Sequence, residues 1–398
     1  MSYPLDGARI LDLSRLLPGP YGTQLLGDMG AEVVKIEQPG RGDYMREQEP
    51  SVPTGDSHIF SILNRNKQSV SLDLKDDRGR EAFLDIAAEA DAILEGFRPG
   101  VCERLGIGYE TVRERNESIV YVSLTGYGQE SPYEQWAGHD LNYIGIGGLL
   151  GMTGHPDGPP TIPGVPVADF AGGMMAALAL MFGLYQAEAT GEGEYFDVPM
   201  TDTIVSWMEL YAGETLNPDG ETPGRGGTLP SGKFPCYSVY RTADDRYITL
   251  GAMEYHFWEN FCTAVGMEDL ANPDDHRPEG ERAERVRERV AGVFAERPRH
   301  EWLETFDPSE VPVAPVNDLE EVWEDPQVRE RDLLEYREIG GEEVALVNSP
   351  IATGTDREWI REPHPALGED TRTLLADAGY TEDEIAALAA DNVIDEPE

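Results

Sequence analysis

Two linked stretches decide the fold of this chain: Gly138-His139-Asp140 and Ala168-Asp169-Phe170-Ala171-Gly172-Gly173. A histidine in the first and a carboxylate in the second each precede a segment with helical character, and a glycine-rich loop separates them. The second stretch opens a long apolar run rich in Ala and Met, which predicts a helix over residues 169–187. The two side chains are therefore the first candidate functional pair.

The chain before this pair alternates between strand and helix patterns. Short, largely apolar strands are predicted at residues 9–13, 31–37, 69–74, 92–95 and 119–125. Helices are predicted among them at residues 21–29 and 78–90, and a further one at 201–213. Alternation of this kind favours a parallel sheet with Rossmann-like winding. The predicted fold class is therefore α/β.

The charge balance is strongly acidic. Asp and Glu total 76 against 31 Lys and Arg, which gives a formal net charge of −45. Only four of the basic residues are lysines: Lys35, Lys67, Lys75 and Lys233. Molar salt shortens the Debye length to ~3 Å and so removes most of the self-repulsion. This composition predicts a cytoplasmic protein from a high-salt organism.

Composition also argues against several other classes of protein. A hydrophobic content of 40% with six Trp and 17 Tyr is a poor match to disorder, and no basic stripe suggests a nucleic-acid partner. Cys102, Cys236 and Cys262 form no CxxC pair, so neither a disulfide framework nor a metal site is expected. Early charged residues do not fit a signal peptide. We also expect no apolar stretch of about 18 residues, and hence no membrane partner.

With residues 7–22 and Val34-Lys35-Ile36-Glu37, the two opening stretches resemble the family III CoA-transferases. This is the carnitine dehydratase/bile-acid-inducible (CaiB/BaiF) family, which includes the α-methylacyl-CoA racemases. The resemblance covers nearly the whole chain. It implies a Rossmann-like large domain, a smaller α+β domain and an interlocked homodimer. The implied ligands are coenzyme A thioesters, as substrates, with no separate cofactor.

Four ranges follow for the predicted domains. Residues 1–216 form the first part of the large CoA-binding domain, and the Gly-, Pro- and Thr-rich residues 217–232 form a linker. Residues 233–317 form the small domain, which opens with a predicted hairpin around Ala243-Asp244-Asp245. Residues 318–398 contain a second linker and, by the resemblance, a return to the large domain.

The resemblance implies that CoA contacts Leu17, Leu72, Lys75, Phe97, Arg98, Arg104 and Met200. Residues 16–22 lack the GxGxxG pattern of a dinucleotide loop. The family resemblance implies that their backbone lines the CoA pocket. Arg65 and Lys67 are further candidates for binding the CoA phosphates. The alternative, that they are solvated basic residues on a loop, is given equal weight. Gln38 departs from the pattern, because many relatives carry a basic residue there.

The segment Gly164-Val165-Pro166-Val167-Ala168-Asp169 makes Asp169 the catalytic carboxylate in the family's pattern. By itself, an Asp at a helix start is most simply an N-cap. As a nucleophile, Asp169 would attack the thioester to give a mixed anhydride and then an aspartyl-CoA thioester. The first expectation is CoA transfer from an acyl-CoA donor to a carboxylic acid, with succinyl-CoA and mesaconate as candidate donor and acceptor.

The alternative is a 2-methylacyl-CoA racemase. Gly138-His139-Asp140-Leu141-Asn142-Tyr143 resembles the racemase subgroup, in which His139 and Asp169 would be the two bases. Glu254, in Gly251-Ala252-Met253-Glu254, resembles the racemase glutamate that faces the site and would tune His139. A non-catalytic CoA-binding scaffold is a third interpretation, against which the presence of both Asp169 and His139 argues.

Overall fold

The computed structural model describes residues 2–351, 353 and 357–396. These residues divide into two compact units. The first unit comprises 2–148, 164–208 and the described part of 327–396, and the second comprises 149–163 and 209–326. Residues 149–163 and 209–216 thus pack with the second unit, although the sequence assigned them to the large domain. The four domain ranges predicted from the sequence describe parts of the chain that fold independently. Packing contacts alone do not test independent folding, so these ranges stay a prediction.

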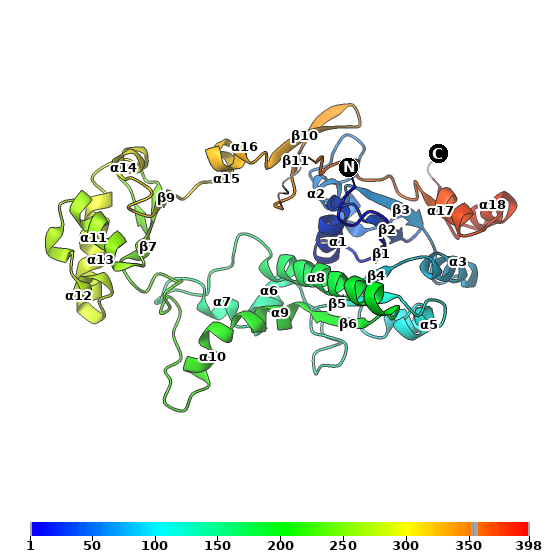
Figure 1. The fold of residues 1–398 in the computed structure, drawn as a ribbon, viewed down its shortest axis with the longest axis horizontal. Helices are drawn as coiled ribbons and strands as arrows, with labels where there is room; N and C mark the ends of the chain where they lie inside the picture. Colours follow the sequence, from blue (N-terminus) through cyan, green and yellow to red (C-terminus); the bar gives the residue numbers. More distant parts are fainter. Residues whose placement is uncertain (1, 352, 354–356, 397–398) are drawn as a thin grey trace. The chain divides into compact units, whose positions relative to one another are not determined.

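The first unit is built on a six-stranded sheet in which every pairing is parallel (Figure 1). The strands are β1 (Arg9–Leu13), β2 (Glu32–Glu37), β3 (Lys67–Ser71), β4 (Ala92–Glu95), β5 (Val120–Thr125) and β6 (Tyr195–Pro199). Their order is β3-β2-β1-β4-β5-β6, which reverses direction between β1 and β4. This is the doubly wound Rossmann order, with the switch point between these two strands. The prediction of an α/β parallel sheet is confirmed.

Helices cover both faces of this sheet. One face packs on α1 (Pro18–Asp28) and α8 (Val167–Thr190), and the other packs on α3 (Asp77–Ala88), α17 (Thr371–Asp377) and α18 (Glu382–Ala390). The other helical segments of this unit are η1 (Tyr44–Glu47), α2 (His58–Leu63), α4 (Val101–Leu105), α5 (Tyr109–Arg113), α6 (Asp140–Ile146) and α9 (Met200–Trp207). The C-terminal helices α17 and α18 complete the same core as β1–β3, so the chain end returns to this unit.

Helices α1 and α8 approach each other so closely that only glycine fits between them. A Cβ on Gly22 would lie 2.5 Å from the carbonyl oxygen of Gly173, and one on Gly173 would lie 2.3 Å from that of Pro18. Real Cβ atoms do not come this near to backbone oxygen. Gly22 and Gly173 therefore let the N-terminal half of α8 pack directly against the N-terminal half of α1.

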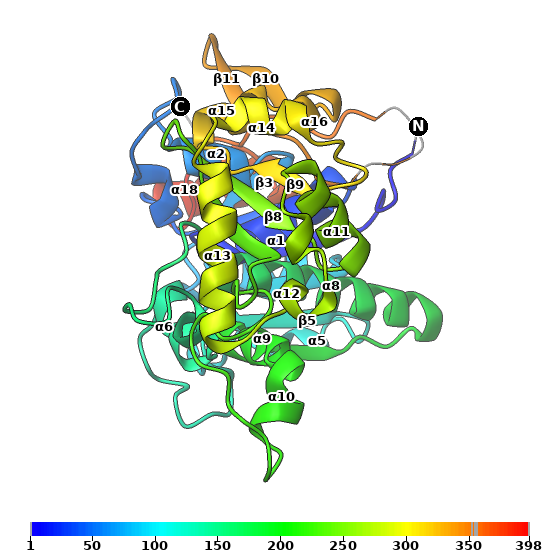
Figure 2. The same ribbon diagram turned by 90° about the vertical axis from the view of Figure 1, so that its left-hand side faces the viewer.

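The second unit holds a three-stranded antiparallel sheet (Figure 2). Its strands are β7 (Tyr237–Arg241), β8 (Tyr247–Gly251) and β9 (Val313–Pro315), so the hairpin predicted around residues 243–245 is confirmed. Trp258, Phe261 and Phe294 are fully buried in its core. Its helical segments are α7 (Leu149–Met152), α10 (Glu209–Thr215), α11 (Tyr255–Ala264), η2 (Glu268–Leu270), α12 (Pro273–His276), α13 (Gly280–Phe294), α14 (Arg299–Thr305) and α15 (Leu319–Glu324).

Helix α16 (Pro326–Glu330) lies at the boundary between the units, and the hairpin β10 (Leu334–Ile339) and β11 (Glu342–Val347) belongs to the first unit. This hairpin and strands β6 and β9 were not predicted. The predicted helix 201–213 is two helices, α9 and α10, which meet at Met208. The third strand begins two residues earlier than predicted and ends at Ser71.

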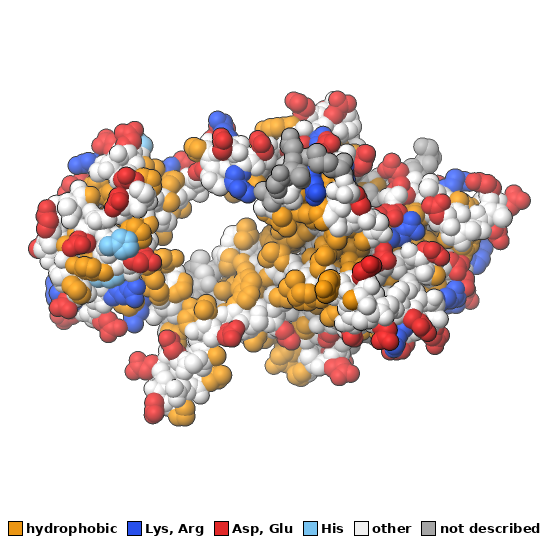
Figure 3. Space-filling view, in the orientation of Figure 1, with side chains coloured by type: hydrophobic (Ala, Val, Ile, Leu, Met, Phe, Trp, Pro, Cys, Tyr) orange, Lys and Arg blue, Asp and Glu red, His pale blue; other side chains and the backbone are white. Residues whose placement is uncertain are grey.

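The expectation that no apolar stretch long enough for a membrane exists is wrong for α8. This helix has a mean hydropathy of 1.7 over 18 residues, and half of that window is buried. Its Ala, Leu and Met residues raise the hydropathy, and its buried Gly and Ala residues allow the helix to pack against α1, β5 and α9. The opposite side is exposed, and Figure 3 shows hydrophobic side chains gathered over the region of α8.

Candidate active site

A cavity of about 540 Å³ lies at the carboxyl edge of the parallel sheet. Its walls include residues 14–16 after β1, residues 96–98 after β4, residues 124–127 at the end of β5, and Met200 directly after β6. In open α/β sheets, ligands bind outside the carboxyl ends of the strands at the switch point. The cavity occupies that position, beside β1 and β4.

A smaller cavity of about 120 Å³ adjoins it toward β2 and β3. Residues 36–38 at the end of β2 and residues 72–75 after β3 line it. Both cavities share Ser14, Arg15 and Phe97 in their walls. A ligand with two bulky ends can therefore extend along the sheet edge and cross near these three residues.

Asp169 lines the larger cavity from the first turn of α8. Partial burial is the main reason that the pKa of this carboxyl rises to about 6, and the like charge of Asp140 adds to the rise while His139 opposes it. No donor to the Asp169 carboxylate is found among the residues that the structure describes. The group is thus ionised at neutral pH yet poorly stabilised, as expected of a nucleophile or a base.

Asp140 ties the start of α6 to the start of α8. Its Oδ1 accepts hydrogen bonds from the backbone N–H groups of Ala168 at 2.5 Å and Asp169 at 3.3 Å. Asp140 thereby caps α8 from outside, a role that the sequence alone assigned most simply to Asp169 itself. Because Asp140 follows His139 directly, the same contact holds His139 and Asp169 in one cavity wall.

His139 is the N-cap residue of α6, and its side chain is exposed in the larger cavity. Its backbone N–H donates to Oδ1 of Asn142 at 3.1 Å. The hydroxyl of Tyr143 donates to the carbonyl of Gly138 at 2.7 Å, which fixes the loop just before the histidine. The geometry therefore places an imidazole and a carboxylate in one cavity on rigid helix starts.

The predicted CoA residues separate into three groups. Leu72 and Lys75 line the smaller cavity, Arg98 and Met200 line the larger one, and Phe97 lines both. Leu17 and Arg104 line neither cavity. Leu17 precedes α1, and Arg104 is exposed on α4. Glu254 is the exposed N-cap residue of α11 in the second unit, so its role beside His139 stays a prediction.

The structure gives Arg65 and Lys67 a structural role in place of the phosphate role. Both side chains are buried: Arg65 pairs with Asp28 at 2.7 Å and Lys67 pairs with Asp12 at 3.0 Å. The connection between α2 and β3 lies inside the unit, which the sequence pattern did not reveal. Lys35 is also fully buried, so two of the four lysines never reach the surface.

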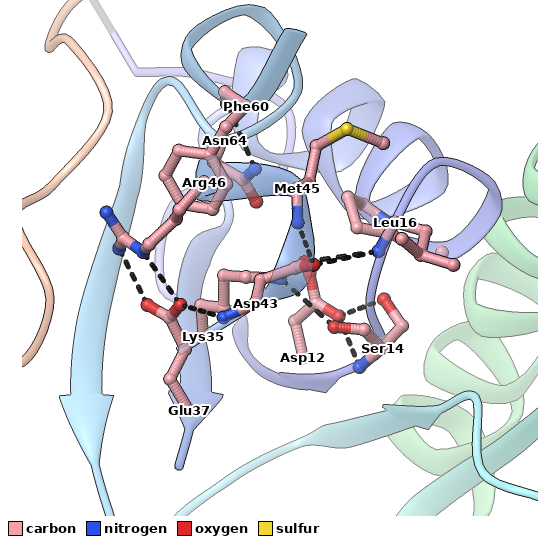
Figure 4. A network of polar contacts seen from close by, with 12 residues as sticks. Asp12, Ser14, Leu16, Lys35, Glu37, Asp43, Met45, Arg46, Phe60 and Asn64 are labelled. Atoms are coloured by element: carbon pink, nitrogen blue, oxygen red, sulfur yellow. Dashed lines mark hydrogen bonds and ion pairs between the residues drawn. The ribbon is translucent and has the colours of Figure 1, made fainter. Parts of the chain in front are cut away.

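A buried polar network supports the turn between β1 and α1 (Figure 4). Nζ of Lys35 lies 3.0 Å from Oδ2 of Asp43 and donates to the carbonyl of Ser14 at 3.0 Å. Asp43 in turn accepts the backbone N–H of Leu16 at 3.1 Å. The ammonium groups of Lys67 and Lys35 outweigh the effect of burial and lower the pKa of Asp12. Charge inside the unit thus fixes the turn that forms the wall of both cavities.

Sequence reasoning missed several lining residues. Arg15 lines both cavities, and the aromatic residues Tyr127, Trp136 and Tyr143 line the larger one. Arg15 lies two residues after a predicted strand, which is a usable signal. Recognising that signal requires the strand order, because only a strand at the switch point delivers its next residues to the ligand site.

Comparison with known proteins identifies the family of this chain. The sequence model of CoA-transferase family III matches residues 5–371. The chain is 35% identical over 388 residues to the succinyl-CoA:mesaconate CoA-transferase of Haloarcula hispanica, covering 94% of this chain and 96% of that protein. It is 31% identical over 396 residues to the α-methylacyl-CoA racemase of Homo sapiens, covering 98% and 97%.

A solved CaiB/BaiF family protein from Brucella suis has the same fold, with a TM-score of 0.82 and 28% identity. The match covers 95% of this chain and 100% of that one. The chain is therefore an enzyme of the α/β class with a Rossmann-ordered sheet. It belongs to the family III CoA-transferases, also called the CaiB/BaiF family.

Proposed function

We propose that this enzyme transfers CoA from an acyl-CoA donor to a carboxylic acid, with Asp169 as the nucleophile. The observation that carries the proposal is the Asp169 carboxylate, which lines the cavity at the sheet's switch point without a hydrogen-bond donor among the described residues. Succinyl-CoA is the proposed donor and mesaconate, or a similar small dicarboxylate, the proposed acceptor. The 35% identity to the Haloarcula hispanica transferase supports this choice.

The proposed reaction begins with two exchanges at the donor. The Asp169 carboxylate attacks the donor thioester carbon, the C–S bond breaks, and CoA leaves as thiolate from an acyl–aspartyl anhydride. The thiolate then attacks the aspartyl carbonyl and releases the donor as a free carboxylate. The product is an aspartyl-CoA thioester, so the energy of the original thioester is retained on the enzyme.

Two matching exchanges complete the transfer. The acceptor carboxylate attacks the aspartyl thioester and expels CoA thiolate. The thiolate attacks the acceptor acyl carbon, which restores the Asp169 carboxylate. No net proton is consumed, so the route requires an ionised Asp169 but no separate general base. A pKa of about 6 leaves this carboxyl ionised at neutral pH and more basic than an ordinary aspartate.

A second candidate function is racemisation of a 2-methylacyl-CoA. It is favoured by the position of His139 in the same cavity wall as Asp169, and by the 31% identity to the human racemase. One group would remove the α-proton and the other would return a proton to the opposite face. This route forms no covalent bond to Asp169.

One pair of incubations separates the two functions. With succinyl-CoA and mesaconate, transfer predicts a new thioester that appears only when the acceptor acid is present. With a 2-methylacyl-CoA in deuterated water and no acceptor, racemisation predicts deuterium at the α-carbon. The His139→Ala variant should abolish exchange if the enzyme is a racemase, but only slow transfer if it is a transferase. Exchange without transfer would overturn the proposal.

The proposal includes a homodimer, interlocked as the family resemblance implies. Support comes from an apolar stripe on the exposed side of α8: Met174, Leu178, Phe182 and Tyr185 are 47, 43, 58 and 80% exposed. Their spacing of three or four residues places them on one helix face, and apolar patches of this kind commonly form interfaces. Light scattering should find a dimer that persists on dilution, and an active monomer would contradict this.

A further inference from the structure

We propose that Arg15 binds the diphosphate of the CoA thioester where the substrate crosses from the smaller to the larger cavity. This assignment rests on the proposed function, because it takes CoA as the ligand. CoA carries its diphosphate between the nucleoside and the pantetheine arm that ends in the thioester. A thioester beside Asp169 and a nucleoside beside Leu72 and Lys75 would bring the diphosphate to the shared wall of the two cavities.

Arg15 is the cation in that shared wall, together with Ser14 and Phe97. Its guanidinium carbon lies 5.0 Å from the ring centre of Tyr44 and 5.1 Å from that of Phe97. Nη1 donates to the hydroxyl of Tyr44 at 3.0 Å. Within the described parts of the chain, Arg15 has no carboxylate in ion-pair range. The guanidinium has five N–H donors, so several remain for a planar fork onto phosphate oxygens.

The other cationic side chains each line one cavity only: Lys35 and Lys75 line the smaller cavity, and Arg98 lines the larger one. Dinucleotide-binding Rossmann folds hold a diphosphate with backbone N–H groups of a glycine-rich turn at the first helix. Here α1 begins with Pro18-Gly19-Pro20, and proline has no N–H to donate. Gln38, which lines the smaller cavity, carries no charge. The turn after β1 therefore lacks the usual backbone cradle, and the Arg15 side chain is placed to replace it.

The backbone on both sides of Arg15 is held before any ligand arrives. Leu16 has a left-handed backbone with φ of 65°, which is uncommon for a leucine. Asp43 accepts the Leu16 N–H, and Lys35 bonds both Asp43 and the carbonyl of Ser14 (Figure 4). The two aromatic rings restrict the side chain as well. Little conformational freedom remains to be lost on binding, so the contact is preorganised.

The test compares Arg15→Gln with Arg41→Gln. Arg41 is the matched control because its guanidinium carbon lies 4.4 Å from the same Tyr44 ring, while its exposed side chain pairs with Glu47 and lines neither cavity. Dissociation constants are measured by calorimetry at fixed salt for CoA, 3′-dephospho-CoA and pantetheine. We expect Arg15→Gln to weaken CoA and 3′-dephospho-CoA about 10- to 100-fold. Pantetheine, which lacks the diphosphate, should bind unchanged, and Arg41→Gln should change all three less than about twofold.

Arg15→Lys is the second variant. It keeps the charge but loses the planar fork, so its affinity for CoA should fall between wild type and Arg15→Gln. Circular dichroism and the melting temperature confirm that each variant is folded. Unchanged CoA affinity in Arg15→Gln overturns the proposal. A loss of affinity for CoA but not for 3′-dephospho-CoA also overturns it, because Arg15 would then contact the 3′-phosphate. An equal loss of affinity for pantetheine overturns it as well, because pantetheine has no diphosphate. A wild-type enzyme that binds no CoA would instead contradict the proposed function.

Discussion

Replacement of Asp169 by Asn should abolish transfer and also stabilise the fold at neutral pH. Burial and the charge of Asp140 raise the pKa of Asp169 from 3.8 to about 6. The ionised carboxylate therefore destabilises the native state. It lies in a cavity wall that offers it no hydrogen-bond donor among the described residues. Asn has a similar shape and no charge, so it removes both the nucleophile and the cost of burying it.

Proton linkage gives the sign and size of the stability change in Asp169→Asn. The folded pKa lies above the unfolded value, so the native state binds more protons between pH 3.8 and about 6. Stability contributed by Asp169 therefore falls as pH rises through that window. A difference of about two pKa units corresponds to at most about 3 kcal/mol. Water in the open cavity screens the charge, so we expect about 1–2 kcal/mol of stabilisation at pH 7, and almost none below pH 4.

The assay is urea unfolding in molar KCl at pH 7 and at pH 4. Asp219→Asn is the control, because Asp219 is exposed and its loss changes the net charge by the same amount. At pH 7, Asp169→Asn should unfold at higher urea than wild type and the control, with an unchanged slope. At pH 4 the difference should nearly vanish. A variant no more stable than the control, or less stable, would show that Asp169 is a structural cap and that its buried charge does not destabilise the fold.

Three further predictions concern charge and packing. The melting temperature should be lower at low KCl than at molar KCl, because the net charge of −45 is then poorly screened. Asp140→Asn should shift the acid limb of the rate profile down by less than about one pH unit, since Asp140 is the second cause of the raised pKa of Asp169. Gly173→Ala should cost about 1–3 kcal/mol in urea unfolding, because the new Cβ would lie 2.3 Å from the Pro18 carbonyl oxygen. Gly145→Ala, whose Cβ would meet nothing within 4 Å, is its control.

Each of these has a clear contrary result. Equal melting temperatures at both salt concentrations would contradict the high-salt interpretation of the composition. An acid limb that stays in place in Asp140→Asn would mean that Asp169 does not control the rate. Equal stability of the two Gly→Ala variants would mean that α1 and α8 can separate without cost.

The central strands could be predicted because the sheet buries both of its faces. Such strands are continuous apolar runs, and β1 and β4 occur where the sequence placed them. Strand β6 was missed because it is a short, partly exposed edge strand that ends in Pro199 and passes directly into α9. The β10–β11 hairpin mixes charged and apolar residues on a small, half-buried sheet, which gives a weak pattern.

The candidate site was only partly accessible from sequence. Asp169 and His139 could be chosen from the resemblance. Their position in one cavity wall depends on the hydrogen bond from Ala168 to Asp140, which joins α8 to α6 across 28 residues of sequence. Arg15 could not be chosen without the order of the strands. Arg65 was misjudged for the opposite reason, because a basic cluster in an acidic chain suggested a surface while its pairing with Asp28 is buried. Long-range pairing, rather than local pattern, decided these cases.

Covalent catalysis by Asp169 is tested most directly by trapping the intermediate on this residue. The native enzyme is incubated with succinyl-CoA and treated with hydroxylamine or borohydride, and the modified residue is located by mass spectrometry. A label on Asp169 is expected, which appears only with the acyl-CoA donor and is absent in Asp169→Asn. A label on another residue, or full transfer activity in Asp169→Asn, would contradict the proposed mechanism.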